Sequence, residues 1–344
     1  MRTEQELTQV IAVRRTTSRR AGLVIGVSAL AVAIVLSIAV GSRSLGPATV
    51  WHVLWHDDGS PAAVIVHQLR LPRTVLGIGV GAALGLAGTL MQALTRNPLA
   101  EPGLLGVNLG ASTGVVLAIA FLGVSSATGY VWFAFAGALL TSAAVFALGG
   151  TGRALTPERQ VLAGVSFTAV LGALVWAVLV TRRQAFDRYR HWDVGSLADR
   201  DTATIVQVLP FILAGIALAL VLGRQLNALS MGDESATALG ARPARTRVLG
   251  VLAVTLLCGA ATAAAGPLWF VGLAVPYAAR LFTGTDHRWI LAYSLVLGPT
   301  LLLLADVAGR VLVAPAELPV GVVTAFLGAP LFIALCRRRK LRLL

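Results

Sequence analysis

Lysine is almost absent from this chain of 344 residues: the only one is Lys340, and Leu341 follows it. A phosphate-binding loop of the pattern GxxxxGK[ST] needs a lysine followed by serine or threonine, so the chain cannot hold ATP in that way. A lysine Schiff base inside a membrane is excluded for the same reason. We therefore expect neither an ATPase site nor a catalytic residue in this chain.

Cysteine is also scarce. Cys258 and Cys336 fall in apolar segments, where we expect them to pack as small apolar side chains. Two such residues cannot build a disulfide framework or a thiolate metal site. His52 and His56 have the i, i+4 spacing of metal ligands, but two tryptophans alternate with them, which favours an amphipathic helix at a membrane interface. We expect no metal and no cofactor.

Charged residues are few. They make up 12% of the chain, apolar residues make up 57%, and the mean hydropathy is +0.82. This composition is typical of an all-α polytopic membrane protein, in which each helical crossing takes roughly 20 apolar residues. The first apolar run, 21–41, is too long for the core of a signal peptide, and we interpret it as a retained first span.

Apolar runs between turn signals predict about ten transmembrane helices in one domain, 1–344. The expected spans are 21–41, 74–95, 103–123, 130–150, 160–181, 204–222, 248–266, 267–282, 289–305 and 320–336. An even number places both termini on one side. The basic ends (Arg14 to Arg20 and Arg337 to Arg342) make that side cytoplasmic, with a tail at 1–20 and a loop at 223–247. The net charge of +13 therefore reflects topology rather than a nucleic-acid partner.

Carboxylates are missing from the middle of every expected span, and Asp306 and Glu317 lie only at an outer edge. Ion-coupled transporters usually bury a carboxylate for the coupling ion, so this pattern argues against secondary transport. A purely structural scaffold is a weaker reading still, because it would not need spans broken by Gly and Pro.

Arginines on the outer side form a second pattern. They either snorkel at helix ends or attract an acidic protein or an anionic ligand. In the segment RLPR, Arg70 and Arg73 flank a proline at a helix start, a rigid way to present two carboxylate binders. The outer set is Arg43, Arg70, Arg73, Arg182, Arg183, Arg188, Arg190, Arg200 and Arg310.

A polar stretch, SMGDESATALGA at 230–241, lies between apolar segments. It is helix-prone and carries two adjacent carboxylates, Asp233 and Glu234. Such a loop is suited to contact a cytoplasmic partner.

Prolines interrupt the chain at two further places. In MQALTRNPLAEPGLLG, Asn97-Pro98 and Glu101-Pro102 stop the helix, which indicates a tight turn or backbone that lines a cavity or gate. Gly266-Pro267 breaks a long apolar run and predicts a short or broken helix after it.

Several motifs run in order along nearly the whole chain: RLPR (70–73), RNPLAEPGLLG (96–106), WDVGSL (192–197), GDESATALG (232–240), GPLWFVGLAVP (266–276), ADVAGR (305–310) and ELPVG (317–321). Together they resemble the FecCD family, the permease subunits of bacterial ABC importers for ferric siderophores, haem and cobalamin. Within the family, the stretches 90–112 and 226–267 are most similar to a permease for a catecholate siderophore. The family usually has a histidine where this chain has Tyr277, so a role that needs an imidazole there is in doubt.

The resemblance implies a type II ABC importer permease fold in the cytoplasmic (inner) membrane. It implies as partners a cytoplasmic ABC ATPase dimer, an extracytoplasmic siderophore-binding protein and a second permease subunit, homologous or identical, with an Fe(III)-siderophore as substrate. Haem or cobalamin import is the alternative. The implied site residues are Ser230, Gly232, Asp233, Glu234, Ala238, Leu239 and Gly240 for ATPase coupling; Arg70, Arg73 and Arg310 for docking of the binding protein; and Met91, Gln92, Asn97, Pro98 and Leu99 for the inner gate and pathway.

Overall fold

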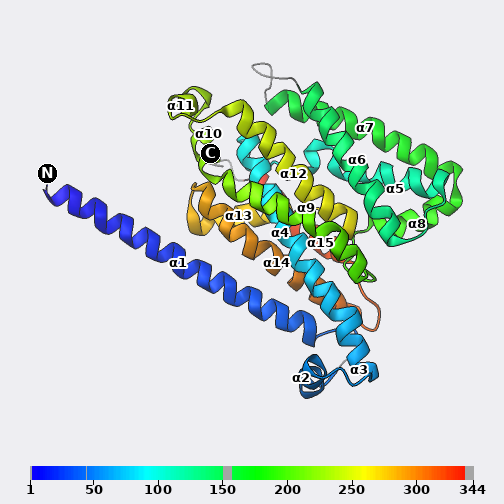
Figure 1. Cartoon of the computed structure of the whole chain (residues 1–344). Helices are drawn as coiled ribbons and strands as arrows, with labels where there is room; N and C mark the ends of the chain where they lie inside the picture. The colour runs from blue at the N-terminus through cyan, green and yellow to red at the C-terminus, as the bar shows by residue number, and fades with distance from the viewer. Residues whose placement is uncertain (1, 44, 150–156, 338–344) are drawn as a thin grey trace.

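The computed structural model describes residues 2–43, 45–149 and 157–337, and every regular element in these ranges is helical (Figure 1). Ten helices overlap the ten expected spans: α1 (Arg2–Ala39), α4 (Leu71–Thr95), α5 (Val107–Leu122), α6 (Ala127–Leu148), α7 (Pro157–Thr181), α9 (Thr202–Val221), α12 (Pro243–Ala265), α13 (Val271–Thr283), α14 (His287–Leu312) and α15 (Val320–Arg337). The basic residues Arg338 to Arg342 lie outside the described part of the chain.

Short helices connect these ten: α2 (Pro47–Trp55), α3 (Pro61–Val64), a π-helical turn η1 (Ile65–Arg70), a 3₁₀ turn η2 (Pro102–Leu105), α8 (Arg183–Asp193), α10 (Gly223–Ser230) and α11 (Asp233–Ala238). By length and apolar composition, eight helical segments of the described residues could cross a membrane, and α5 and α13 are shorter apolar helices. The break expected at Gly266-Pro267 is confirmed. Gly266 and Phe270 have φ of 81° and 68°, so α13 begins only at Val271.

The core forms around α4, which runs through the centre of the bundle between α9, α12, α13 and α14 (Figure 1). Small residues allow this close packing. Gly81 lies against the backbone of Pro299 in α14, and Gly88 lies against the backbone of Gly272 in α13. In lipid, van der Waals packing rather than water exclusion holds helices together, so these glycine contacts fix the position of α4.

The outer helices present apolar side chains away from the bundle. Val24, Ile25 and Val32 on α1 are exposed, as are Val170 and Val180 on α7. Exposed side chains of this kind suit the acyl chains of a bilayer. The N-terminal part of α1 extends well away from the other helices (Figure 1), and the segment 2–20, expected as a tail, is helical.

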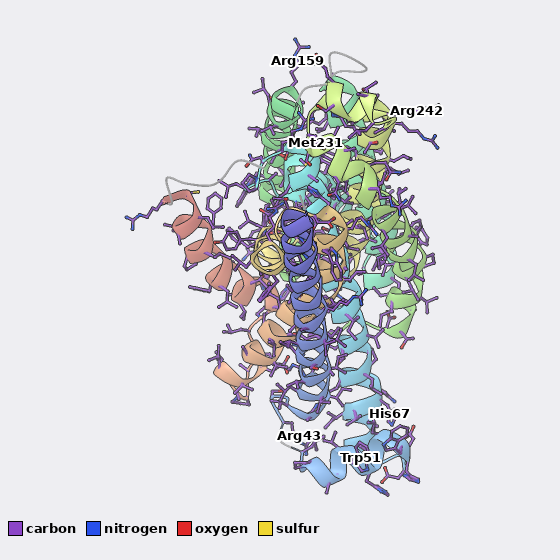
Figure 2. The ribbon with its side chains drawn as sticks, turned by 90° about the vertical axis from the view of Figure 1, so that its left-hand side faces the viewer. Arg43, Trp51, His67, Arg159, Met231 and Arg242 are labelled. Carbon is purple, nitrogen blue, oxygen red and sulfur yellow. The ribbon has the colours of Figure 1, made fainter. Side chains whose placement is uncertain are left out.

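The two ends of the molecule are distinct. Arg43, Trp51 and His67 lie at one end, whereas Arg159, Met231 and Arg242 lie at the other (Figure 2). The first three belong to the residues expected outside and the last three to those expected inside, so the structure separates the two groups as the topology requires. His52 and His56 stack at 5.1 Å between ring centroids, and the described residues contain no group of three His, Cys, Asp or Glu that could hold a metal.

Candidate functional site: coupling loop, inner gate and outer arginine cluster

The polar stretch expected to contact a partner forms α11 at the end of the molecule that carries Met231. Gly232 precedes this helix with φ of 104°, a conformation that favours glycine. The carboxylates of Asp233 and Glu234 lie in the first turn, where the helix dipole favours negative charge. Met231 and Leu239 are 66% and 65% exposed. An exposed, partly apolar surface therefore surrounds the acidic turn, while Ala236 packs inward.

Asp233 and Glu234 differ in their surroundings. The Asp233 carboxylate accepts hydrogen bonds from Arg96 Nη2 at 2.6 Å and from Arg247 Nη2 at 2.9 Å, and Arg96 also donates to the Leu229 carbonyl at 2.7 Å. Burial alone would raise the pKa of Asp233, but the hydrogen bonds from Arg247 and Arg96 outweigh it and hold the pKa below its ordinary value. Glu234 is exposed. Asp233 therefore faces this chain, and Glu234 faces away from it.

Arg96 directly follows α4 and opens the loop expected to form the inner gate. It has a left-handed backbone with φ of 51°, and it ends the helix. The next residue, Asn97, is exposed and accepts the N–H of Leu99 at 2.9 Å, which stabilises the turn through Pro98. The Asp233–Arg96 pair therefore links α11 directly to this loop.

Met91 and Gln92 lie one turn inside the end of α4, and both are buried. Within the described part of the chain, neither the Oε1 nor the Nε2 atom of Gln92 has a hydrogen-bond partner. A buried amide without partners is costly in a bundle core. Gln92 is thus an unsatisfied polar group beside the expected gate, while Asn97, Pro98 and Leu99 lie nearer the surface.

Glu101 joins the same loop to α13. Its Oε1 atom accepts the N–H of Phe270 at 2.7 Å, at the residue that precedes α13. Two irregular segments, one after α4 and one before α13, are therefore held together by a single carboxylate. The sequence identified both breaks but gave no signal that one of them binds the other.

The outer arginine cluster (Arg70, Arg73, Arg310, Asp306 and Glu317) lies at the opposite end. Arg73 donates to Asp306 at 2.7 Å and to Glu317 at 2.6 Å, and Arg310 donates to Asp306 at 2.6 Å. The structure extends α14 to Leu312, so Asp306 lies inside this helix rather than past its end at 305, and it is fully buried. Two guanidinium groups neutralise this carboxylate, so it is not a free ion-coupling group.

The arginines of the cluster also hold the end of α1. Arg310 Nη1 donates to the carbonyls of Ser37 and Val40 at 2.8 and 2.9 Å. Arg70 donates to the carbonyls of Ile38, Ala39 and Arg43 at 2.7 to 2.8 Å. The last carbonyls of a helix lack intrahelical partners and carry partial negative charge, so both cations stabilise this end.

The three arginines expected at the outer surface therefore lie in one cluster, but their side chains bond inside the chain. Arg70, Arg73 and Arg310 are 5%, 9% and 2% exposed. They line a cavity of about 990 Å³ together with Arg43, Arg188, Arg200 and other residues. Arg70 has no carboxylate partner among the described residues. Three cations and two carboxylates leave the cluster with a net positive charge toward this cavity.

Some of these contacts were accessible from the sequence and others were not. Asp306 and Arg310 have the i, i+4 spacing of a helical ion pair. Arg96 opens the motif RNPLAEPGLLG but comes 137 positions before Asp233, and Arg247 lies in α12, the helix after α11. Only the fold brings these residues together. Tyr277, which stands where the family usually has histidine, is half-buried in α13.

Comparison with known proteins agrees with this geometry. The FecCD transport family matches residues 29–338. The ferric enterobactin transport system permease protein FepD of Escherichia coli (strain K12) is 49% identical over 312 residues, which cover 90% of this chain and 93% of that protein. The hemin transport system permease protein HmuU of Yersinia pestis is 37% identical over 310 residues, with 88% and 92% covered.

A solved structure described as an inward-facing conformation of a metal-chelate type ABC transporter has the same fold. It covers 94% of this chain and 99% of its own, with a TM-score of 0.79 and 28% identity. This chain therefore belongs to the FecCD transport family and is the membrane permease subunit of an ABC importer.

Proposed function

We propose that this permease carries an Fe(III)-siderophore across the cytoplasmic membrane, with the energy supplied by a separate ATPase. The observation that carries the proposal is the connection from α11 through Asp233 and Arg96 to the loop that follows α4. This connection joins a surface suited to an outside partner to the loop that follows α4, the most central helix. A relative named for ferric enterobactin transport is 49% identical, against 37% for one named for hemin, which favours the siderophore over haem.

The orientation follows from the basic residues. Both termini and the loop 223–247 face the cytoplasm, and the end that carries Trp51 and the outer arginine cluster faces outward. In this orientation α11 meets the ATPase. The chain forms one transmembrane domain over 1–344.

The residues of the coupling loop have two roles: some form the surface that meets the ATPase, and Asp233 passes the movement to the rest of the chain. Ser230, Gly232, Ala238, Leu239 and Gly240 shape or present the surface that meets the ATPase, together with Glu234. Asp233 instead transmits the movement, because its carboxylate is bonded to Arg96 and Arg247.

The inner gate then comprises Asn97, Pro98 and Leu99 in the loop, with Met91 and Gln92 above it in α4. Displacement of α11 moves Arg96 and with it this loop, because the ion pair is short and Arg96 also holds the Leu229 carbonyl. The unsatisfied amide of Gln92 gains a partner when the pathway opens and admits water or cargo.

The outer cluster docks the binding protein. Arg70 is the main docking residue, because its guanidinium group bonds only to carbonyl groups. Arg73 and Arg310 already bind carboxylates of this chain. A second permease subunit, related or identical, completes the pathway. Acidic residues on the binding protein complete the docking interface.

The proposal is tested by uptake into vesicles that contain this permease with its partner permease and ATPase. Ferric catecholate presented by its binding protein should enter only when ATP is on the ATPase side, and an ATPase variant unable to hydrolyse ATP is the control. Haem and cobalamin with their own binding proteins measure the alternative cargo. Uptake that a proton ionophore abolishes at constant ATP would instead support an ion-coupled transporter.

A further inference from the structure

A lateral groove lies between the end of α9, the start of α10 and the start of α14, at the end of the bundle that carries α11. It has a volume of about 470 Å³ and is lined by Leu220, Val221, Arg224, Arg288, Trp289 and Ala292, among others. None of these residues is among those assigned to ATPase coupling, to the gate or to the outer cluster, although Arg224 lies at the start of the loop 223–247. The groove therefore needs an explanation of its own.

Two cations border this groove without a partner for either side chain among the described residues. Arg224 and Arg288 are exposed, and neither guanidinium group takes part in a hydrogen bond or ion pair there. Asp286, two positions before Arg288, already has other partners: its carboxylate accepts the Arg288 backbone N–H and the Asn227 amide, and it faces Arg19 at 3.7 Å. Two guanidinium groups are therefore free to bind an anion.

The depth of the groove is fixed by the helices that form it. Arg224 follows the last residue of α9 by three positions, and Arg288 is the second residue of α14; both helices are candidate membrane spans. The arginines therefore lie at the boundary between the apolar layer and water, where lipid phosphates are found. Trp289 beside them is typical of a membrane interface.

The opposite part of the groove is apolar and open to the side. Leu220 and Val221 are 46% and 68% exposed at the end of α9, on the surface suited to acyl chains. Gly223, next to the groove residue Arg224, allows two of its helices to pack closely. A Cβ atom there would lie 3.2 Å from Cγ of Arg288 and 3.4 Å from Cδ1 of Leu291, so the absence of a side chain lets α10 approach α14.

We propose that this groove binds one anionic phospholipid, with its phosphate between Arg224 and Arg288 and the start of an acyl chain along Leu220 and Val221. Guanidinium groups bind phosphate oxygens in pairs, and basic pockets between membrane helices at their water boundary take anionic headgroups. The bound lipid connects α10, which leads into α11, with α14. It thereby steadies the base of the coupling loop from the lipid side.

The test uses the permease purified with its partner subunits, stripped of lipid and titrated by native mass spectrometry. The probes are phosphatidylglycerol, cardiolipin, phosphatidylcholine and inorganic phosphate. Wild type should bind one anionic lipid in preference to phosphatidylcholine. Arg224→Gln and Arg288→Gln should each weaken that binding about fivefold, the expected effect of removing one basic contact at a membrane surface. Ala292→Trp fills the groove without a charge change and should also displace the lipid.

Arg242→Gln is the matched control, because Arg242 is exposed at the same end but projects away from the bundle (Figure 2). It should leave lipid binding unchanged. Equal affinity for phosphatidylcholine and phosphatidylglycerol would overturn the proposal, as would inorganic phosphate that binds as tightly as the lipids. If a variant that carries both Arg224→Gln and Arg288→Gln keeps its lipid affinity but loses its ATPase subunits, the arginines belong to a protein contact and the lipid site is wrong.

Discussion

Arg96 and Asp233 lie 137 positions apart in the chain, yet their side chains meet at 2.6 Å. Arg96 ends the central helix, and Asp233 begins α11, the helix that we propose meets the ATPase. Because Asp233 also binds Arg247, a push on α11 reaches both α4 and α12. In the proposed mechanism, coupling therefore depends on the hydrogen bonds that the Asp233 carboxylate makes inside the chain, as well as on the surface that α11 presents outside.

The first prediction tests this link. Asp233→Asn should reduce the amount of siderophore imported per ATP hydrolysed, while the ATPase subunits still copurify with the permease. Glu234→Gln, one position away and exposed, is the matched variant and should act on ATPase binding if it acts at all. The double change Arg96→Asp with Asp233→Arg should restore part of the coupling. Loss of the ATPase subunits in Asp233→Asn would show that this residue is a direct docking contact.

The second prediction concerns pH. Burial alone would raise the pKa of Glu317, but hydrogen bonds from Arg73 and Ser42 hold it below the ordinary value. A depressed pKa contributes stability that is complete above the unfolded value, about 4.3, and is lost as pH falls through the lower, folded value. The melting temperature of wild type should therefore exceed that of Glu317→Gln by a constant amount from pH 8 to pH 5.5. The difference should shrink below pH 4; a difference that grows on acidification would contradict the assignment.

The third prediction concerns the buried carboxylate of the outer arginine cluster. Asp306→Ala leaves Arg73 and Arg310 without their shared partner, and breaking a buried ion pair from one side costs about 3–5 kcal/mol. Asp187→Ala removes an exposed pair with Arg190 at 3.8 Å and should cost less than about 1 kcal/mol. Thermal unfolding in detergent compares the two. Equal losses would mean that the cluster is solvated and does not hold α1.

The fourth prediction addresses helix packing. A Cβ atom added at Gly88 would overlap the backbone of Gly272, whereas one added at Gly172 on α7 would meet nothing within 4 Å. Gly88→Ala should therefore lower the melting temperature and the yield of assembled complex, and Gly172→Ala should change neither. Normal stability of Gly88→Ala would show that α4 and α13 can separate at no cost.

The fifth prediction separates docking from capping at Arg70. If Arg70 meets the binding protein, Arg70→Gln should weaken docking by about 2 kcal/mol or more at low salt, and added salt should reduce the difference. Gly41→Val is the companion variant, because a Cβ atom there would lie 2.6 Å from Nη2 of Arg70 and disturb the guanidinium group without removing it. Unchanged docking with a lowered melting temperature would make Arg70 a cap of α1 and nothing more.

Much of the fold follows from the lengths of the apolar runs in the sequence. All ten expected spans meet helices, because runs of about 20 apolar residues have few alternatives in a membrane. Prolines and glycines marked the breaks after α4 and before α13. The apolar runs predict the ends of the helices less well. α14 continues to Leu312 because Asp306 and Arg310 form an ion pair within it, whereas a prediction from apolar residues ends the span at the first charge.

The sequence predicts the candidate site only in part. The exposed loop with Asp233 and Glu234 stood out against apolar surroundings, but the opposite directions of its two carboxylates depend on Arg96 and Arg247. The outer arginines were recognisable as a set, but not their burial, because carbonyl groups at the end of α1 serve as partners and have no sequence signature. The contact between Glu101 and Phe270 joins two loops and has no spacing rule at all.

The attachment of α1 has a consequence for how the chain assembles. The final carbonyls of this helix accept hydrogen bonds from Arg70 and Arg310. Arg310 is synthesised 273 residues after Ser37, whose carbonyl it binds. During synthesis the first helix must therefore stay in the bilayer on the strength of its own apolar surface, and water must solvate its outer end. Only when α14 has entered does the first span become fixed, so the last third of the polypeptide completes what the first forty residues begin.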